Sequence, residues 1–194
     1  MLMVRDWADL VQHQKMSKYV LALDQSTQIT GWALYKDYKE LVHYGKIEPK
    51  GELINRVISL RDWVKKLIIG LKDNNQDIEI VIEEIQLQNI PGTNREGNVA
   101  TFKKLAYVQA ILLELVEDLK IPCKIIASSS WKSSCGVRGS KRAEQKQNAQ
   151  KFVTEKFNIK ATQDESDAIC IGYAYCMEER NKQLESDEGI NWKD

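Results

Sequence analysis

The sequence predicts an α/β fold with a mixed five-stranded sheet, in which the first three strands are antiparallel and helices cover both faces. Two observations support this fold class. Three β-rich runs follow one another closely between residues 18 and 47, and runs joined by short turns form an antiparallel meander. Two further apolar runs alternate with segments of helical periodicity, and this order is typical of parallel crossovers.

The three early strands are marked by apolar or alternating runs. The first run, 19–23, is wholly apolar or aromatic and ends at Asp24. The second, 30–34, follows a short polar turn, and the third, 40–47, alternates between polar and apolar residues. Their short spacing leaves room only for tight turns, so each strand is expected to pair with the next.

Helices and strands alternate in the rest of the chain. Residues 52–71 have apolar side chains at helical spacing, and the largely apolar run 78–82, interrupted by Glu79, then ends at two acids, Glu83 and Glu84. A polar loop over 86–97 leads to a predicted long helix over 98–119. The strands predicted over 19–23 and 78–82 both end in acids. Their carboxyl ends are expected to meet at the same edge of the sheet.

The last third of the chain is more polar. A short strand is predicted over 123–127, followed by an irregular segment rich in Ser, Gly and basic residues. A polar helix over 141–157 and a final helix over 164–180 complete the order. One folded domain is therefore expected over 18–180, with a flexible N-terminal extension over 1–17 and a disordered tail over 181–194.

Composition excludes several classes of protein. No apolar run approaches the roughly 20 residues that cross a bilayer, so no membrane partner is expected. The N-terminus carries Asp6 and Asp9 and lacks the apolar core of a signal peptide. The four scattered cysteines have no C-x-x-C spacing and the chain has two histidines, which argues against a zinc site. Reduced thiols and a cytoplasmic location are expected.

Carboxylates follow the first and fourth predicted strands. Asp24 at the end of a buried strand is costly unless a cation or hydrogen-bond donors compensate its charge. The alternative is that Asp24 only caps a turn through Ser26 and Thr27. After the fourth strand, alternation turns one of Glu83 and Glu84 inward, but both faces of this strand are apolar, so the pattern does not decide between them.

A second acidic pair opens the final helix. Asp164 and Asp167 are three residues apart, so they share one helix face in the first turn, where the helix dipole favours carboxylates. N-capping is the alternative role, although Glu165 and Ser166 are available for it. Acids that converge without His or Cys favour Mg²⁺ or Mn²⁺, and two such ions suit phosphoryl chemistry.

Three motifs of the chain resemble those of the RuvC Holliday-junction resolvases, of the ribonuclease H-like superfamily, and look most like the phage-type members. LALDQSTQITGWAL is similar to the first-strand motif, and VIEEIQ is similar to the I-E-x motif, which places the family's Glu on Glu83. DESDAICI resembles the D-x-x-D-A motif, which gives Asp164 and Asp167. The resemblance spans about residues 18–175 and implies a ribonuclease H-like fold over the domain.

Two positions depart from the family's pattern. Pro-Gly usually follows the first acid, where this chain has Gln25-Ser26. A base-stacking aromatic residue usually follows the Glu by a few positions, where this chain has Gln86 or Leu87. The backbone of the turn after Asp24 is therefore the place where this chain is expected to differ.

A basic segment extends from Lys132 to Lys160, with eight basic residues and two acidic ones in a chain of zero net charge. Such a bias beside a nuclease site is the electrostatic footprint of nucleic-acid binding, whereas a solvated helix face is the preferred interpretation for 151–160. Trp131 could stack on a base, but core packing is preferred for it. The candidate DNA-binding residues are Lys103, Lys104, Lys132, Arg138, Lys141, Arg142 and Lys146.

The resemblance implies a crossover-junction endodeoxyribonuclease that hydrolyses four-way and other branched DNA in recombination, repair or phage DNA processing. It would act in the cytoplasm of a bacterial or phage-infected cell, with Mg²⁺ or Mn²⁺, two ions per site, as cofactor. A homodimer is implied because a four-way junction needs two matched cuts, with the apolar stripe of 98–119 as its interface or simply as core. The implied catalytic residues are Asp24, Glu83, Asp164 and Asp167, all four as metal ligands, and Lys146 or Lys132 beside the scissile phosphate.

Three other functions are open at this point. A nuclease of the same fold could cut flaps, forks or RNA–DNA hybrids. A non-catalytic DNA-binding relative would be expected to lack one of the acids, and none is missing. LALDQST also resembles the phosphate-binding opening of sugar kinases and actin-like ATPases, but those need a second such domain, for which 194 residues leave no room.

Overall fold

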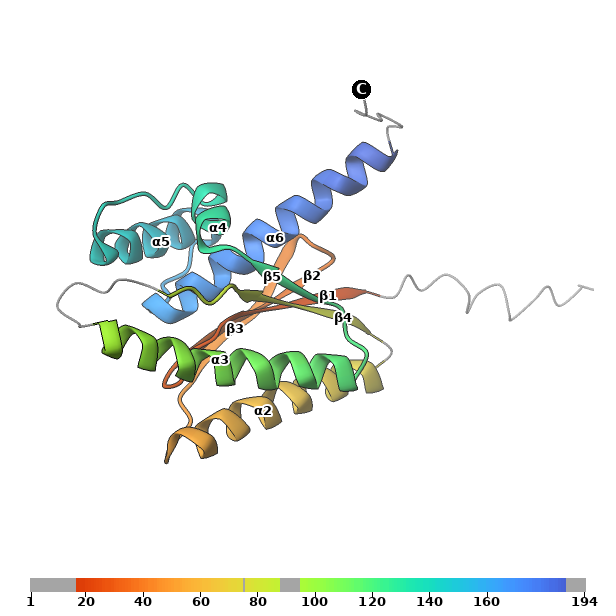
Figure 1. Cartoon of the computed structure of the whole chain (residues 1–194). Coiled ribbons are helices and arrows are strands. Elements are labelled where there is room, and N and C mark those ends of the chain that lie inside the picture. The colour runs from red at the N-terminus through yellow and green to blue at the C-terminus, as the bar shows by residue number, and fades with distance from the viewer. Residues whose placement is uncertain (1–16, 75, 88–94, 188–194) are drawn as a thin grey trace, which may run out of the picture.

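The computed structural model describes residues 17–74, 76–87 and 95–187, and it contains one five-stranded sheet in the order β3-β2-β1-β4-β5 (Figure 1). β1 pairs antiparallel with β2, and β2 pairs antiparallel with β3. β4 is parallel to both β1 and β5. The predicted mixed sheet is confirmed; its strands are β1 (Lys18–Asp24), β2 (Thr30–Lys36), β3 (Glu40–Ile47), β4 (Asp77–Glu83) and β5 (Cys123–Ile126).

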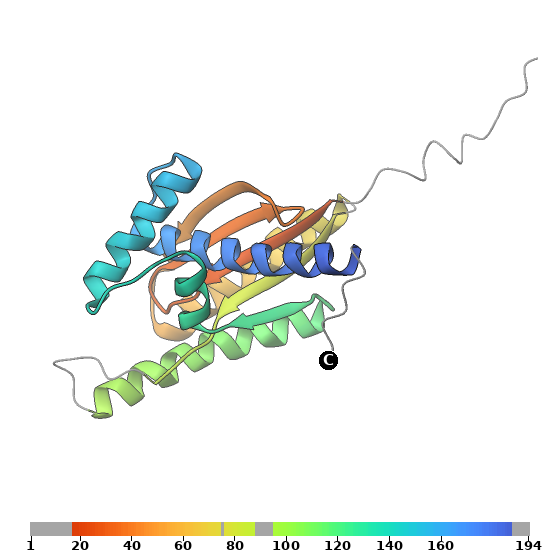
Figure 2. The ribbon, with the colours of Figure 1, turned by 90° about the horizontal axis from the view of Figure 1, so that it is seen from above.

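Helices cover both faces of the sheet, as predicted (Figures 1 and 2). One apolar core lies between the sheet and two long helices, and a second lies between the sheet and the three C-terminal helices. The first pair is α2 (Leu53–Asp73) and α3 (Arg95–Asp118). The second group is α4 (Ser128–Ser134), α5 (Arg142–Phe157) and α6 (Gln163–Asp187).

The register of the central strands brings two acids to one edge. Leu23 of β1 pairs with Ile82 of β4 in a parallel ladder. The next residue of each strand is therefore an acid, Asp24 or Glu83, at neighbouring carboxyl ends. This is the edge at which open α/β sheets place their sites.

Two glycines allow α6 to lie directly on the sheet, which it crosses over β1 and β2 (Figure 2). A Cβ added to Gly31 of β2 would lie 1.9 Å from the backbone oxygen of Asp164. A Cβ added to Gly172 of α6 would lie 2.5 Å from the ring of Tyr35. Both distances are far below van der Waals contact, so the missing side chains set how closely the acidic first turn of α6 approaches β2.

The segment after β5 differs from the prediction. Residues predicted as irregular include the short helix α4, Ser128–Ser134. Serines favour caps and turns, which is why the sequence pattern indicated a loop. Trp131 is 3% exposed, and its packing into the core provides the tertiary contact that a helix of this length needs.

Two helix boundaries differ from the prediction by three residues or more. α3 begins at Arg95, three residues before the predicted start at residue 98. α6 continues through Asp187 beyond its predicted end near Arg180, so part of the predicted disordered tail is helical. Lys182 forms ion pairs one turn back with Glu178 and Glu179, which supports a helix that has few apolar contacts there.

Some predictions fall on residues outside the described ranges. The predicted N-terminal extension lies outside them except for Ser17, as do residues 88–94 of the predicted loop and 188–194 of the predicted tail. Within the ranges that are described, none of the helices has the length and apolar character required to cross a membrane.

Candidate active site

Asp24 lies partly buried at the end of β1, with acids from β4 and α6 around it. Its pKa is raised well above the usual value, first by burial and then by three neighbouring carboxylates, those of Asp167, Glu83 and Asp164. The ammonium of Lys146 acts in the opposite direction. The structure therefore brings all four predicted acids within electrostatic reach of one another.

Asp167 shares this environment. Burial raises its pKa to about 6, and the charges of Glu83 and Asp164 add to the shift. Lys146 and Lys132 oppose it, so both predicted lysines also lie near the carboxylates. The Lys146 ammonium is 4.0 Å from the Asp164 carboxylate. We call the four acids and two lysines the carboxylate cluster: Asp24, Glu83, Lys132, Lys146, Asp164 and Asp167.

Capping at the start of α6 falls to another residue. The backbone N–H of Thr162 donates to the Glu165 carboxylate at 2.7 Å, the return bond of a capping box. The turn after β1 is likewise closed by its own hydroxyls, because the backbone N–H of Ser26 donates to Thr30 Oγ1 at 3.1 Å. The capping roles considered as alternatives for the acids are thus carried by other side chains.

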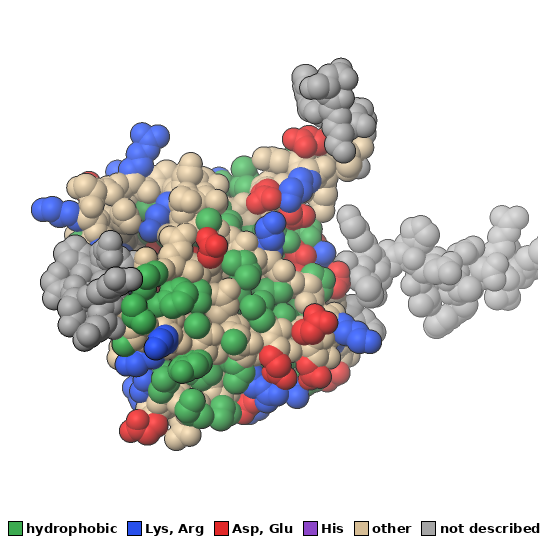
Figure 3. Space-filling view, viewed as in Figure 1, with side chains coloured by type: hydrophobic (Ala, Val, Ile, Leu, Met, Phe, Trp, Pro, Cys, Tyr) green, Lys and Arg blue, Asp and Glu red, His purple; other side chains and the backbone are tan. Residues whose placement is uncertain are grey.

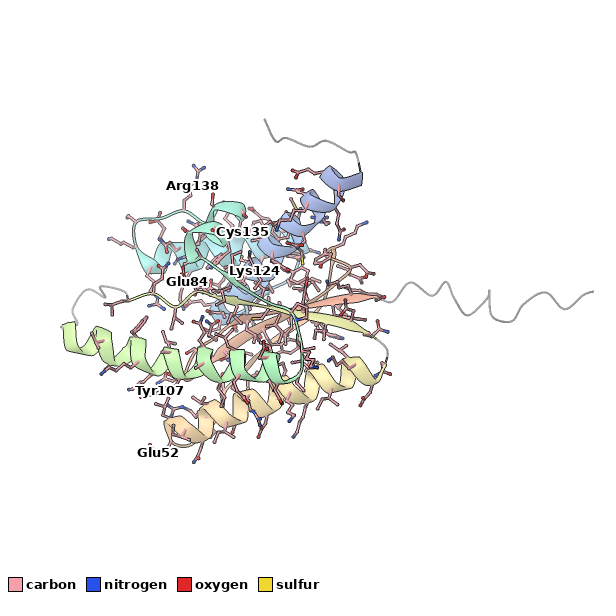
Figure 4. All side chains as sticks on the ribbon, turned by 45° about the vertical axis from the view of Figure 1, so that its right-hand side comes forward. Glu52, Glu84, Tyr107, Lys124, Cys135 and Arg138 are labelled. Atoms are coloured by element: carbon pink, nitrogen blue, oxygen red, sulfur yellow. The ribbon has the colours of Figure 1, made fainter. Side chains whose placement is uncertain are left out.

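Glu83 is the inward-facing member of its pair. Its carboxylate accepts a hydrogen bond from the indole N–H of Trp131 at 2.8 Å. Glu84 is exposed and accepts from the Gln86 amide at 3.1 Å (Figure 4). The contacts therefore separate the two glutamates, which alternation alone left open.

Gln25 stands where the family that the chain resembles usually has proline, and its side-chain amide binds the backbone of Glu83. It is 7% exposed, and its amide oxygen accepts from the backbone N–H of Glu83 at 3.2 Å. Its amide nitrogen donates back to the Glu83 carbonyl. This two-way contact continues the β1–β4 pairing past the last ladder residues. Sequence reasoning missed it, although the departure from Pro-Gly marked the position.

The other predicted DNA-binding residues lie farther out. Arg138, Lys141 and Arg142 are exposed around the start of α5, and Figure 4 shows Arg138 pointing away from the fold. Lys103 and Lys104 are exposed on α3, which covers the opposite face of the sheet from α5. The structure thus brings two of the seven basic candidates, Lys132 and Lys146, to the carboxylates.

The donor set of the cluster suits a hard divalent cation. Four carboxylates that repel one another, with no His or Cys among them, match the oxygen ligands of Mg²⁺ and Mn²⁺. Among the described residues, no three side chains of Asp, Glu, His or Cys already lie close enough together to hold an ion. The fit therefore rests on the chemistry of the donors and on their mutual repulsion.

The burial of Asp167, together with the nearby charges of Glu83 and Asp164, predicts a pH-dependent stability for the metal-free protein. The Asp167 pKa is about 6 in the folded chain against an ordinary 3.8, so the folded state binds this proton more tightly. The stabilisation is complete at low pH and is lost as the pH rises through that window. Asp167→Asn should therefore be more stable than the unmodified protein at pH 7, with an advantage that shrinks toward pH 4. Melting temperatures in EDTA across this range test it; a difference that stays constant with pH would contradict it.

Comparisons with known proteins agree with the fold. No family model matches the chain. The uncharacterized protein UU157 of Ureaplasma parvum serovar 3 is 26% identical over 181 residues, which cover 89% of this chain and 76% of that protein. The RuvC structure from Thermus thermophilus has a TM-score of 0.61 at 14% identity, over 84% of this chain and 96% of that one.

A second structure, T. thermophilus RuvC in complex with a Holliday junction substrate, has a TM-score of 0.58 with the same identity and the same coverage. At 14% identity these matches establish the arrangement of the chain and nothing about its chemistry. Together with the strand order, they show that the chain has the ribonuclease H-like fold of the RuvC-type resolvases.

Proposed function

We propose that the protein is a metal-dependent endonuclease that hydrolyses four-way and other branched DNA. The observation that supports this most directly is the carboxylate cluster, in which acids from β1, β4 and α6 meet at one edge of a RuvC-like sheet. T. thermophilus RuvC, which shares the fold, has been solved with a Holliday junction substrate. Bound cations would neutralise the four repelling acids of this cluster and would contact a phosphodiester.

The acids and lysines would have different roles. Asp24, Glu83, Asp164 and Asp167 would hold Mg²⁺ or Mn²⁺, two ions in our proposal. When bound, these ions would supply an activated water and neutralise negative charge. Lys146 lies beside Asp164, where its ammonium can stabilise charge that develops on the phosphate, and Lys132 is the second candidate for this role.

A homodimer is part of the proposal, since two matched strands must be cut. The apolar stripe of α3 is mostly core, because Val108, Leu112 and Leu115 are buried against the sheet. Tyr107 of α3 remains 54% exposed, and Ile54 of α2 is 59% exposed. Figure 3 shows apolar side chains gathered on the surface over these two helices. The exposed apolar surface of α2 and α3 is the candidate interface of the homodimer.

Cleavage of labelled substrates tests the proposed function. Four-way junctions, flaps, forks, RNA–DNA hybrids and linear duplexes should be compared side by side with Mg²⁺, with Mn²⁺ and with EDTA. We expect paired cuts in the four-way junction with either ion and none with EDTA. Faster cutting of flaps or hybrids would move the protein to another nuclease class of the same fold. No cutting of any substrate, despite tight junction binding, would favour a non-catalytic role.

The exposed basic residues at the start of α5 should contribute to DNA affinity. Lys141→Ala combined with Arg142→Ala should weaken junction binding and reduce the slope of log K against log salt by about 1.8, at about 0.9 for each phosphate that the protein no longer neutralises. Affinities at several salt concentrations measure it.

A charge-matched control is available at the other end of the sheet. Lys36→Ala with Lys39→Ala removes two positive charges near the opposite end of β2 from Asp24, since Lys36 pairs with Tyr19 and Gly31 pairs with Asp24. The control should leave the slope near that of the unmodified protein. Equal effects of the two double variants would move the DNA surface elsewhere.

A further inference from the structure

The contacts of Trp131 reach beyond core packing. Its side chain is 3% exposed, and its indole N–H donates to Glu83 Oε1 at 2.8 Å. An indole N–H can only donate, so the Trp131 nitrogen cannot itself be a metal ligand. A buried donor needs an acceptor, and here the acceptor is a carboxylate of the cluster rather than a backbone carbonyl.

The helix that carries Trp131 is fixed at both ends. α4 begins two residues after β5, whose partner β4 ends at Glu83. At its other end the thiol of Cys135 lies 3.5 Å from the carbonyl oxygen of Cys170 in α6, three residues after Asp167 (Figure 4). α4 therefore lies between β5, the neighbour of the strand that carries Glu83, and the helix that carries Asp164 and Asp167.

Both the backbone and the side chain of Glu83 are consequently fixed by hydrogen bonds. The Gln25 amide binds both the N–H and the carbonyl of its backbone, and the Trp131 indole donates to one oxygen of its carboxylate. The indole donates to Oε1 and leaves Oε2 to other partners. Lys132, the next residue of α4, lies over the Trp131 ring with its ammonium 5.3 Å from the ring centroid.

We propose that Trp131 is a positioning residue that orients the Glu83 carboxylate for metal binding. It does so by fixing Oε1 relative to α4, whose far end contacts α6 through Cys135. This inference rests on the proposed function, because it assumes that the cluster binds a divalent cation. Partners that orient metal ligands in this way typically change affinity by about 10- to 100-fold when they are removed.

Binding of Mn²⁺ to the full chain, measured by electron paramagnetic resonance without DNA, tests the inference. Trp131→Phe keeps an aromatic ring and removes the N–H, and we expect the Mn²⁺ dissociation constant to rise about 10-fold or more. Trp63→Phe is the matched control, because Trp63 packs against Trp32 on the opposite face of the sheet with ring centroids 5.2 Å apart. It should change the constant less than twofold.

The outcomes separate the two proposals. If the unmodified protein binds no Mn²⁺, the proposed metal-dependent function fails, and the role of Trp131 fails with it. If the unmodified protein binds Mn²⁺ and Trp131→Phe binds it equally well, only the role of Trp131 is overturned. A loss of affinity equal in both tryptophan variants would also overturn it, since it would reflect general destabilisation.

A second measurement avoids dependence on the folding of Trp131→Phe. The protein labelled with ¹⁵N-tryptophan gives indole resonances that can be assigned from single Trp→Phe variants of the other tryptophans. Titration with Mg²⁺, which is diamagnetic, should shift the Trp131 indole resonance in a saturable way and leave that of Trp63 in place. An unmoved Trp131 resonance in a protein that binds the ion would overturn the inference.

Discussion

Replacing Asp24 with Asn is expected to abolish DNA cleavage, by on the order of 10³-fold or more, while junction binding survives. Asp24 lies among the other three acids and would share cations with them, so its loss removes the centre of the ligand set. The basic surface that would bind DNA is untouched by the change. Single-turnover cleavage and a binding assay on the same junction separate the two effects, and retained cutting with Mg²⁺ would disprove the assigned site.

The same variant should be more stable than the unmodified protein when metal is absent. Burial and three neighbouring carboxylates raise the pKa of Asp24 above its value in the unfolded chain, so its ionised form at pH 7 opposes folding. Asn keeps the shape and removes the charge. The melting temperature in EDTA should rise by about 2–4 °C for each kcal/mol gained. A fall in melting temperature would show that Asp24 is structurally required, and lost cleavage could then not be attributed to chemistry.

Gly31→Ala should be nearly as damaging although it changes no charge. The new Cβ would meet the backbone of Asp164 at 1.9 Å, and a backbone atom cannot rotate away as a side chain can. The first turn of α6 must move off β2. This movement takes Asp164 and Asp167 away from Asp24. We expect a stability loss of about 1–3 kcal/mol from overpacking and a drop in cleavage of about 10²-fold. Chemical denaturation and cleavage rates measure these effects.

Gly70→Ala is the matched control for that substitution. Gly70 lies exposed in α2, and a Cβ there would meet no atom within 4 Å. Alanine in a helix interior is favoured over glycine by up to about 1 kcal/mol, so this variant should be as stable as the unmodified protein or more so. If Gly31→Ala behaves like Gly70→Ala, the close approach of α6 to β2 does not control the site.

The strand and helix order could be predicted because each element has its own local pattern. β1 and β4 are largely apolar strands that end in acids, and α2 has apolar side chains at helical spacing. The short helix α4 could not be predicted in this way, because its serines indicate a turn and the packing of a single tryptophan outweighs them. Tertiary contacts override local propensity most easily in short elements.

The acids could be singled out from the sequence because they follow recognisable strands and open a recognisable helix. The contacts that orient Glu83 could not be found, because Gln25 is 58 residues away in sequence and Trp131 is 48 residues away. No local pattern joins residues at such separations. The choice between Glu83 and Glu84 likewise depended on resemblance until the structure placed the indole of Trp131 beside one of them.

The order in which the cluster is assembled has a consequence for synthesis on the ribosome. Asp24 and Glu83 belong to the first and fourth strands, whereas Asp164 and Asp167 belong to α6, the last of the described elements in the chain. Domains generally fold as units during synthesis, which proceeds at about 5–20 residues per second. A nascent chain therefore presents only two of the four acids until α6 has left the exit tunnel. The proposed nuclease cannot cut DNA before α6 has emerged and packed against the sheet.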